Sequence, residues 1–226
     1  MREVVLDTET TGLDPLAGHR VVEVGCIELV NTVATGRTFQ VYFNPERVMP
    51  AGAEEVHGLT DAFLADKPVF ADKVEELLAF IGDAQLVIHN AQFDIGFLNA
   101  ELERVGKPGL VNAYIDTVSM ARRRFPGQRV SLDALCERFA VDNSGRTKHG
   151  ALLDAELLAE VYLELSGGRQ RDLGLAPEVA AQAVAGALAA TGLPVRPARP
   201  HAASAAELVA HAEFLKQLSE PLWLAA

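Results

Sequence analysis

The segment Val4–Gly12, with the sequence VVLDTETTG, decides the fold. Its three apolar residues indicate a short buried strand, and two carboxylates, Asp7 and Glu9, follow at the end of that strand. Alternate side chains of a strand point to the same face, so these carboxylates are expected side by side. Such a pair repels unless a cation neutralises it. A solvated turn is the alternative, and the apolar strand before the pair favours an acidic site.

The regions after this strand complete a mixed α/β domain over residues 1–168. Short connections favour an antiparallel meander of the first strand with strands at 21–30 and 38–43. Further strands are expected at 86–88 and 114–115. Helical patterns are expected at 74–81, at 93–105, from the capping residue Ser131 onward, and at 152–165, where Gly167 and Gly168 end the last helix.

The chain changes character after residue 168. Of its 226 residues, 31 are acidic and 20 basic, but residues 167–226 carry five of each, so the net charge of −11 lies in the first region. Residues 169–200 are expected to form a linker because the run 192–200 is rich in proline and glycine. Residues 201–226 form a C-terminal segment with a helical pattern at 205–218.

The composition also excludes several protein classes. The sequence contains no run of eighteen apolar residues, so no membrane span is predicted. Acidic residues occur too close to the start of the sequence for a signal peptide. The two cysteines, Cys26 and Cys136, are expected in the core, which fits a reducing, cytoplasmic setting. The negative net charge argues against a protein that holds long duplex DNA by electrostatics alone.

Three further residues fit an acidic site. Asp94 follows the apolar run 86–88 at the expected start of a helix, where complementing the helix dipole is the alternative role. His149 and Asp154 converge if His149 lies in the loop before its helix, which Gly150 permits. Together, four carboxylates could hold two hard divalent cations about 4 Å apart while a histidine takes a proton from water.

The same motifs resemble the DEDDh family of 3′–5′ exonucleases. The resemblance rests on DTETTG at 7–12, VHG at 56–58, HNAQFD at 89–94, and His149 with Asp154 five residues later, and it covers about residues 2–168. It is particularly close to the proofreading subunits of bacterial replicative DNA polymerases. It implies a ribonuclease H-like fold with a mixed five-stranded sheet flanked by helices.

The resemblance also assigns residue roles. It implies that Mg²⁺ or Mn²⁺ is held by Asp7, Glu9, Asp94 and Asp154, with His149 as general base. Along the 3′-terminal nucleotide it places Thr10, Thr11, Leu13, His57, His89 and Phe93. His19 lies in a probable turn and is expected to be solvated.

A basic segment leads to His149. Residues 122–148 carry seven basic and three acidic side chains. Part of the segment, with Arg146 as the test position, is expected to track the phosphates behind the terminal nucleotide. The alternative is a solvated face that pairs with acidic residues.

The C-terminal region resembles tethering peptides. Gln170, Leu173 and Leu175 match the short glutamine-and-leucine peptides that dock on the bacterial sliding clamp (beta), with an ordinary linker as the alternative. The ranges 207–212 and 222–224 are similar to the tail that binds the polymerase catalytic (alpha) subunit. A small theta-like subunit is a further candidate partner.

These observations predict a proofreading exonuclease that acts on single-stranded or frayed DNA 3′ ends and releases 5′-monophosphates. One alternative is a 3′–5′ exoribonuclease of the same family, similar to ribonuclease T. Another is a stabilising subunit with a vestigial site, which the presence of all five catalytic positions disfavours.

Overall fold

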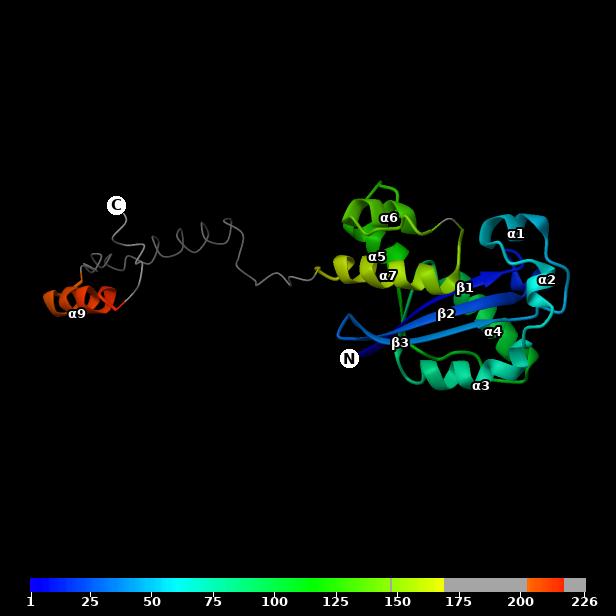
Figure 1. Ribbon diagram of the computed structural model, residues 1–226. Coiled ribbons are helices and arrows are strands. Elements are labelled where there is room, and N and C mark those ends of the chain that lie inside the picture. Colours follow the sequence, from blue (N-terminus) through cyan, green and yellow to red (C-terminus); the bar gives the residue numbers. More distant parts are fainter. Residues whose placement is uncertain (147, 169–202, 218–226) are drawn as a thin grey trace, which may run out of the picture. The chain divides into compact units, whose positions relative to one another are not determined.

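The computed structural model describes residues 1–146, 148–168 and 203–217. The chain divides into two compact units, Met1–Leu173 and Gly174–Ala226, and each is described by itself. The first unit contains a single five-stranded sheet with helices on both faces (Figure 1).

The sheet is mixed, as predicted. Its strands are β1 (Arg2–Thr10), β2 (Val21–Val30), β3 (Val33–Tyr42), β4 (Gln85–Ile88) and β5 (Tyr114–Asp116). They lie in the order β3-β2-β1-β4-β5. The pairs β1–β2 and β2–β3 are antiparallel, which confirms the meander, whereas β4 is parallel to both β1 and β5. The first strand is therefore central, and its carboxyl end lies beside that of β4.

The third strand begins five residues earlier than expected. Asn31 and Thr32 both have positive φ, at 53° and 67°, so a two-residue turn joins Val30 directly to Val33. The start of β3 is exposed and contains a glycine, Gly36, so no alternating apolar pattern marks it.

The first unit has seven described α-helices. They are α1 (Ala51–His57), α2 (Asp61–Leu64), α3 (Phe70–Ile81), α4 (Ala91–Arg104), α5 (Thr117–Arg124), α6 (Leu132–Phe139) and α7 (Ala151–Leu165), with a 3-10 turn, η1, at Pro15–Ala17. Those that pack on the two faces of the sheet are α3 and α4 on one and α5, α6 and α7 on the other. The structure confirms the helices expected from 74, 93, 131 and 152 onward. The short helices α1, α2 and α5 were not predicted.

Alternation along β1 produces two cores. Val4 and Leu6 pack with the apolar side chains of α3 and α4, whereas Val5 packs with those of α5, α6 and α7 on the other face. Figure 1 shows α5, α6 and α7 on one side of the sheet and α3 on the other. Cys26 and Cys136 are both buried in these cores, as predicted.

The second unit contributes one described helix, α9 (Ala205–Leu215), within the range 205–218 where a helix was predicted. Ser204 and Glu207 form a reciprocal capping box at its start. The predicted clamp-binding residues Gln170, Leu173 and Leu175 and the range 222–224 lie outside the described residues. Within the described ranges, no helix is long and apolar enough to cross a membrane.

Candidate active site

The acidic site forms at the carboxyl end of β1. Asp7 pairs with Gly25 of β2 in the antiparallel register, and Glu9 pairs with Glu23. Because alternate side chains share a face, both carboxylates are directed toward the α7 side of the sheet, as the strand spacing predicted. A ligand atom of Glu9 lies within 4.8 Å of one from His149 and one from Asp154.

Gly25 brings α7 close to these carboxylates. A Cβ atom at this position would lie 2.3 Å from the backbone carbonyl carbon of Ala151, so only glycine allows the helix to start directly on β2. Glu23 secures that start, because its Oε2 accepts a hydrogen bond from the Ala151 amide at 3.1 Å. This bond satisfies a first-turn amide of a helix whose N-cap, Gly150, has no side chain. Asp154 is thereby held beside β1.

Asp94 reaches the site from the opposite face of the sheet. It lies in the first turn of α4, after Asn90, whose left-handed backbone (φ 69°) ends the connection from β4. The carboxylate is 2% exposed and accepts a 2.7 Å hydrogen bond from Thr8 Oγ1. Three elements, β1, α4 and α7, therefore supply the four predicted carboxylates.

Three of the four carboxylates have raised pKa values. Burial, followed by repulsion from Asp94, Glu9 and Asp154, raises the pKa of Asp7 well above its usual value. Burial, followed by repulsion from Asp154, raises the pKa of Glu9 to about 8. Burial also raises the pKa of Asp94 to about 7, although the bond from Thr8 opposes the shift. Such shifts mean that a cation would stabilise the ionised cluster strongly.

The donor set fits a hard divalent cation. Four carboxylates provide the oxygen ligands that Mg²⁺ and Mn²⁺ prefer, and the proximity of Glu9, His149 and Asp154 provides a point of convergence. Such ions would stabilise the charged carboxylates against the burial that raises all three pKa values and against the repulsion that adds to it at Asp7 and Glu9.

His149 and Asp154 converge as the sequence predicted. His149 lies in the loop before α7, where its amide donates to the Val56 carbonyl at 3.2 Å, and its Nδ1 lies 3.2 Å from Asp154 Oδ2. Nearly half of the His149 side chain is exposed, whereas 5% of the Asp154 side chain is. The imidazole therefore lies between the buried carboxylate and solvent.

Arg146 pairs with two carboxylates. Its guanidinium binds both oxygens of Asp154, Nε to Oδ1 and Nη2 to Oδ2, each at 2.6 Å, and its Nη1 contacts Asp133 at 2.7 Å. Burial raises the pKa of Asp154, but the neighbouring His149 and Arg146 side chains outweigh it and lower the value overall. Arg146 thus pairs with acidic side chains, as the alternative interpretation held, but its side chain is buried and does not lie on a solvated face. Phosphate binding by the segment 122–148 stays a prediction.

A cavity of about 620 Å³ adjoins the carboxylates. Of the predicted substrate residues, its lining includes Thr10, Thr11, Leu13, His57 and Phe93. The leucine is 86% exposed, an unusual position for a large apolar side chain, and the phenylalanine ring is held against Phe97 at 4.9 Å.

His57, which lines this cavity, has a buried ring nitrogen. Its Nδ1 accepts from the Leu59 amide at 3.0 Å, whereas its buried Nε2 has no hydrogen-bond partner among the described residues. Burial lowers the pKa of His57, although the nearby Thr10 backbone acts in the opposite direction. A buried nitrogen of this kind is suited to a ligand that offers a polar group.

His19 was wrongly predicted to be solvated. Its ring lies where a Cβ of Gly12 would be, its Nδ1 lies 3.1 Å from Thr11 Oγ1, and it lines the cavity. Gly12 was the only sequence signal for this contact, because a residue without a side chain permits close approach.

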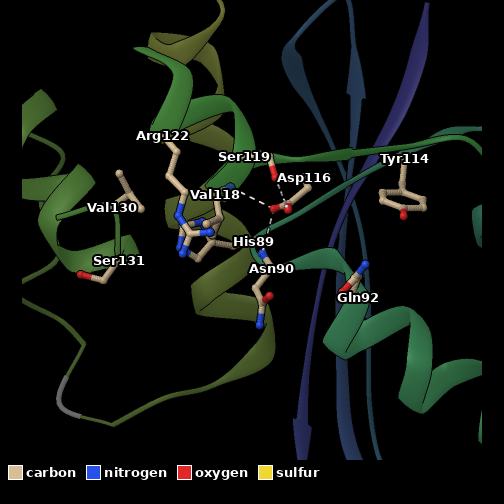
Figure 2. Close-up of a pocket in the computed structure, with 10 residues that line it drawn as sticks. All are labelled: His89, Asn90, Gln92, Tyr114, Asp116, Val118, Ser119, Arg122, Val130 and Ser131. Carbon is tan, nitrogen blue, oxygen red and sulfur yellow. Dashed lines mark hydrogen bonds between the residues drawn. The ribbon is translucent and has the colours of Figure 1, made fainter. Parts of the chain in front are cut away.

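His89 lies in a second cavity, of about 630 Å³, rather than in the first. Figure 2 shows this cavity between β5, α5 and the start of α4. The His89 Nδ1 is 2.9 Å from Thr117 Oγ1. Arg122 points into the cavity and has no hydrogen bond or ion pair with any described residue. Tyr114, about half exposed, lines its far side.

Known proteins resemble this chain in sequence and in fold. The sequence model of the exonuclease family named for ribonuclease T matches residues 4–162. The chain belongs to this exonuclease family. It is 58% identical to the DNA polymerase III subunit epsilon of Rickettsia felis, with 75% of this chain and 76% of that protein covered. It is 49% identical to the same subunit of Escherichia coli K12, with 74% and 72% covered.

Solved structures show the same fold. The nuclease domain of 3′hExo, described as a DEDDh family member bound to rAMP, matches with a TM-score of 0.64 at 19% identity, covering 73% of this chain and 91% of that one. Exonuclease I matches with a TM-score of 0.64 at 17% identity, covering 75% and 41%. The family and fold predictions are confirmed: the chain is a 3′–5′ exonuclease of the DEDDh class and of the epsilon proofreading type.

Proposed function

We propose that the protein removes mispaired 3′-terminal nucleotides from DNA as 5′-monophosphates, with two Mg²⁺ or Mn²⁺ ions. The observation that carries the proposal is the cluster of Asp7 with the buried Glu9, Asp94 and Asp154 beside His149. When bound, the ions would activate a water and stabilise the leaving oxygen of the phosphodiester. The four carboxylates would hold them, and the partly exposed His149 would accept the proton of the water.

The first cavity would hold the terminal nucleotide. Thr10 and Thr11 shape its wall, since their hydroxyls bond the Gly12 carbonyl and the Arg20 amide respectively. The exposed Leu13 and the ring of Phe93 offer apolar surfaces for a base. The Nε2 of His57, which has no partner among the described residues, would offer a polar contact.

The second cavity would take the nucleotides behind the terminal one. Arg122, which pairs with no described residue, would supply positive charge from the basic segment 122–148. His89 lines the same cavity and interacts with the charge of Asp154 in the acidic site. Tyr114 offers a ring for stacking. Two adjacent cavities require a few unpaired nucleotides, so mismatched ends, which melt more easily, would be preferred.

Tethering would compensate for weak intrinsic binding by this acidic protein. We expect the C-terminal segment 201–226 to bind the polymerase III catalytic (alpha) subunit, because the relatives are subunits of that polymerase. Gln170, Leu173 and Leu175 would bind the sliding clamp (beta), and a theta-like subunit remains a further candidate. Domain limits at 168 and 200 and a cytoplasmic location belong to the same proposal.

The test is degradation of a 3′-mismatched DNA primer, its matched counterpart and an RNA of the same sequence. Each substrate is incubated with the wild-type protein and Mg²⁺, with the wild-type protein and a chelator, and with the Asp7→Ala variant and Mg²⁺. Faster metal-dependent release of deoxynucleotides at the mismatch, lost in the variant, is the expected result. Preference for RNA would indicate an exoribonuclease instead, and inactivity of folded protein on every substrate would leave a binding subunit.

A further inference from the structure

Arg146 occupies the position of a cation in the acidic site. Its two short contacts to Asp154 form a planar fork, and its side chain is only 7% exposed. A bidentate guanidinium–carboxylate pair of this kind is strong, because both hydrogen bonds are charge-assisted and the two planar groups match in geometry. Both oxygens of a carboxylate needed for metal binding are therefore engaged by a side chain of the same chain.

The same guanidinium also engages the proposed base. Arg146 Nη2 lies 2.7 Å from His149 Nδ1. A guanidinium nitrogen can only donate, so Nδ1 is the acceptor and its lone pair is engaged. The 3.2 Å approach of the same Nδ1 to Asp154 Oδ2 is then a contact between two acceptors and not a hydrogen bond. In this arrangement His149 cannot accept a proton from water through that nitrogen.

We propose that Arg146 is an internal cation that competes with a divalent ion for Asp154, so that metal binding requires its release. The proposal rests on the metal site of the proposed function. Arg146 lies in the loop between α6 and α7, and Asp133, its partner outside the acidic site, is more than half exposed, so the guanidinium can turn toward solvent on that side. Once released, the guanidinium frees both Asp154 oxygens and His149 Nδ1 together.

A purely structural role is the competing explanation, since Arg146 also links Asp133 of α6 to Asp154 of α7. The two roles differ in their effect on metal affinity. A structural link, when removed, would leave metal affinity unchanged or weaken it. A competitor, when removed, would strengthen it.

The test measures Mn²⁺ affinity of the full chain at pH 7.5 without DNA, by electron paramagnetic resonance of the free ion. Arg146→Gln should bind Mn²⁺ about tenfold more tightly than wild type, the loss of one charge-assisted fork. Arg129→Gln is the matched control: it removes the same charge from the same segment, at an exposed residue without a hydrogen bond or ion pair to any described residue. Its affinity should stay within about twofold of wild type.

A second measurement uses the wild-type protein and does not depend on the folding of a variant. Trypsin should cleave after Arg146 faster when Mn²⁺ is added, relative to its cleavage after Arg129. The proposal would be overturned if Arg146→Gln bound Mn²⁺ with the affinity of wild type, or if Arg129→Gln gained as much Mn²⁺ affinity as Arg146→Gln. It would also be overturned if Mn²⁺ left trypsin cleavage after Arg146 unchanged. Failure of wild type to bind Mn²⁺, or undiminished binding by Asp154→Asn, would contradict the metal site itself.

Discussion

Gly25 is the residue at which β2 and α7 meet with no side chain between them. Alanine there would place its Cβ 2.3 Å from the Ala151 carbonyl carbon, which belongs to backbone and cannot rotate away. The helix would shift, and Asp154 with it.

We expect Gly25→Ala to lower the free energy of unfolding by about 1 to 3 kcal/mol and to reduce kcat on a mismatched primer severely. Chemical denaturation and single-turnover kinetics measure the two effects. Gly96→Ala is the matched control, because its Cβ meets nothing within 4 Å on α4. A fully active Gly25→Ala variant with wild-type stability would contradict the role of this contact.

At the scale of elements, the end of α5 and the start of α4 form the second cavity. We expect Arg122→Gln to raise KM for single-stranded DNA about fivefold and to lower the slope of its salt dependence by about one contact. It should leave hydrolysis of a mononucleotide ester unchanged, since that substrate reaches only the first cavity. Steady-state kinetics at several salt concentrations provide the test.

The neighbouring Arg123→Gln serves as the control for this experiment. Arg123 lies on the same helix, is exposed and does not line the cavity. If both substitutions raised KM equally, the effect would come from the lower net charge and not from a contact in the cavity. If Arg122→Gln lost ester hydrolysis, Arg122 would instead contribute to the reaction at the acidic site.

At the scale of the whole molecule, the acidic cluster links stability to pH. Glu9 and Asp94 have pKa values of about 8 and about 7 in the folded protein, above those of ordinary carboxyls. The folded state therefore binds more protons than the unfolded state between about pH 4.5 and 8, so stability must fall as pH rises through that range. We expect Tm in chelator to fall from pH 5.5 to 8.5.

Mn²⁺ should reduce this fall, because it replaces the protons that leave the cluster. Glu9→Gln should flatten the dependence in chelator, since the substituted side chain does not titrate. Differential scanning calorimetry across the pH series measures both. A Tm in chelator that is constant or rises with pH would show that the cluster is not strained by its own charge.

The second unit yields a separate prediction. We expect deletion of residues 201–226 to abolish capture of the polymerase catalytic subunit while leaving degradation of free single strands unchanged, because the whole acidic site lies within the first unit. Pull-down and primer degradation on the same preparations measure the two properties. Capture that survives the deletion would assign polymerase binding to another part of the chain.

Much of the protein was predictable from its sequence because the signals are local. The strand period places Asp7 and Glu9 on one face, the apolar runs identify the strands of the sheet, and the motif at 89–94 places Asp94 at a helix start. The short helices α1, α2 and α5 were missed because four to eight residues carry too little periodicity to be recognised.

Only the tertiary structure decided which groups meet across the chain. The fit of α7 on Gly25, the ring of His19 against Gly12, and the fork of Arg146 on Asp154 each join segments whose contact no spacing encodes. His89 and Phe93, four residues apart, face different cavities because the first turn of α4 runs between them. The sequence by itself determined the chemistry available to this protein. The packing of β2, α4 and α7 decided where that chemistry converges, because close approach depends on the shapes of surfaces that are distant in sequence.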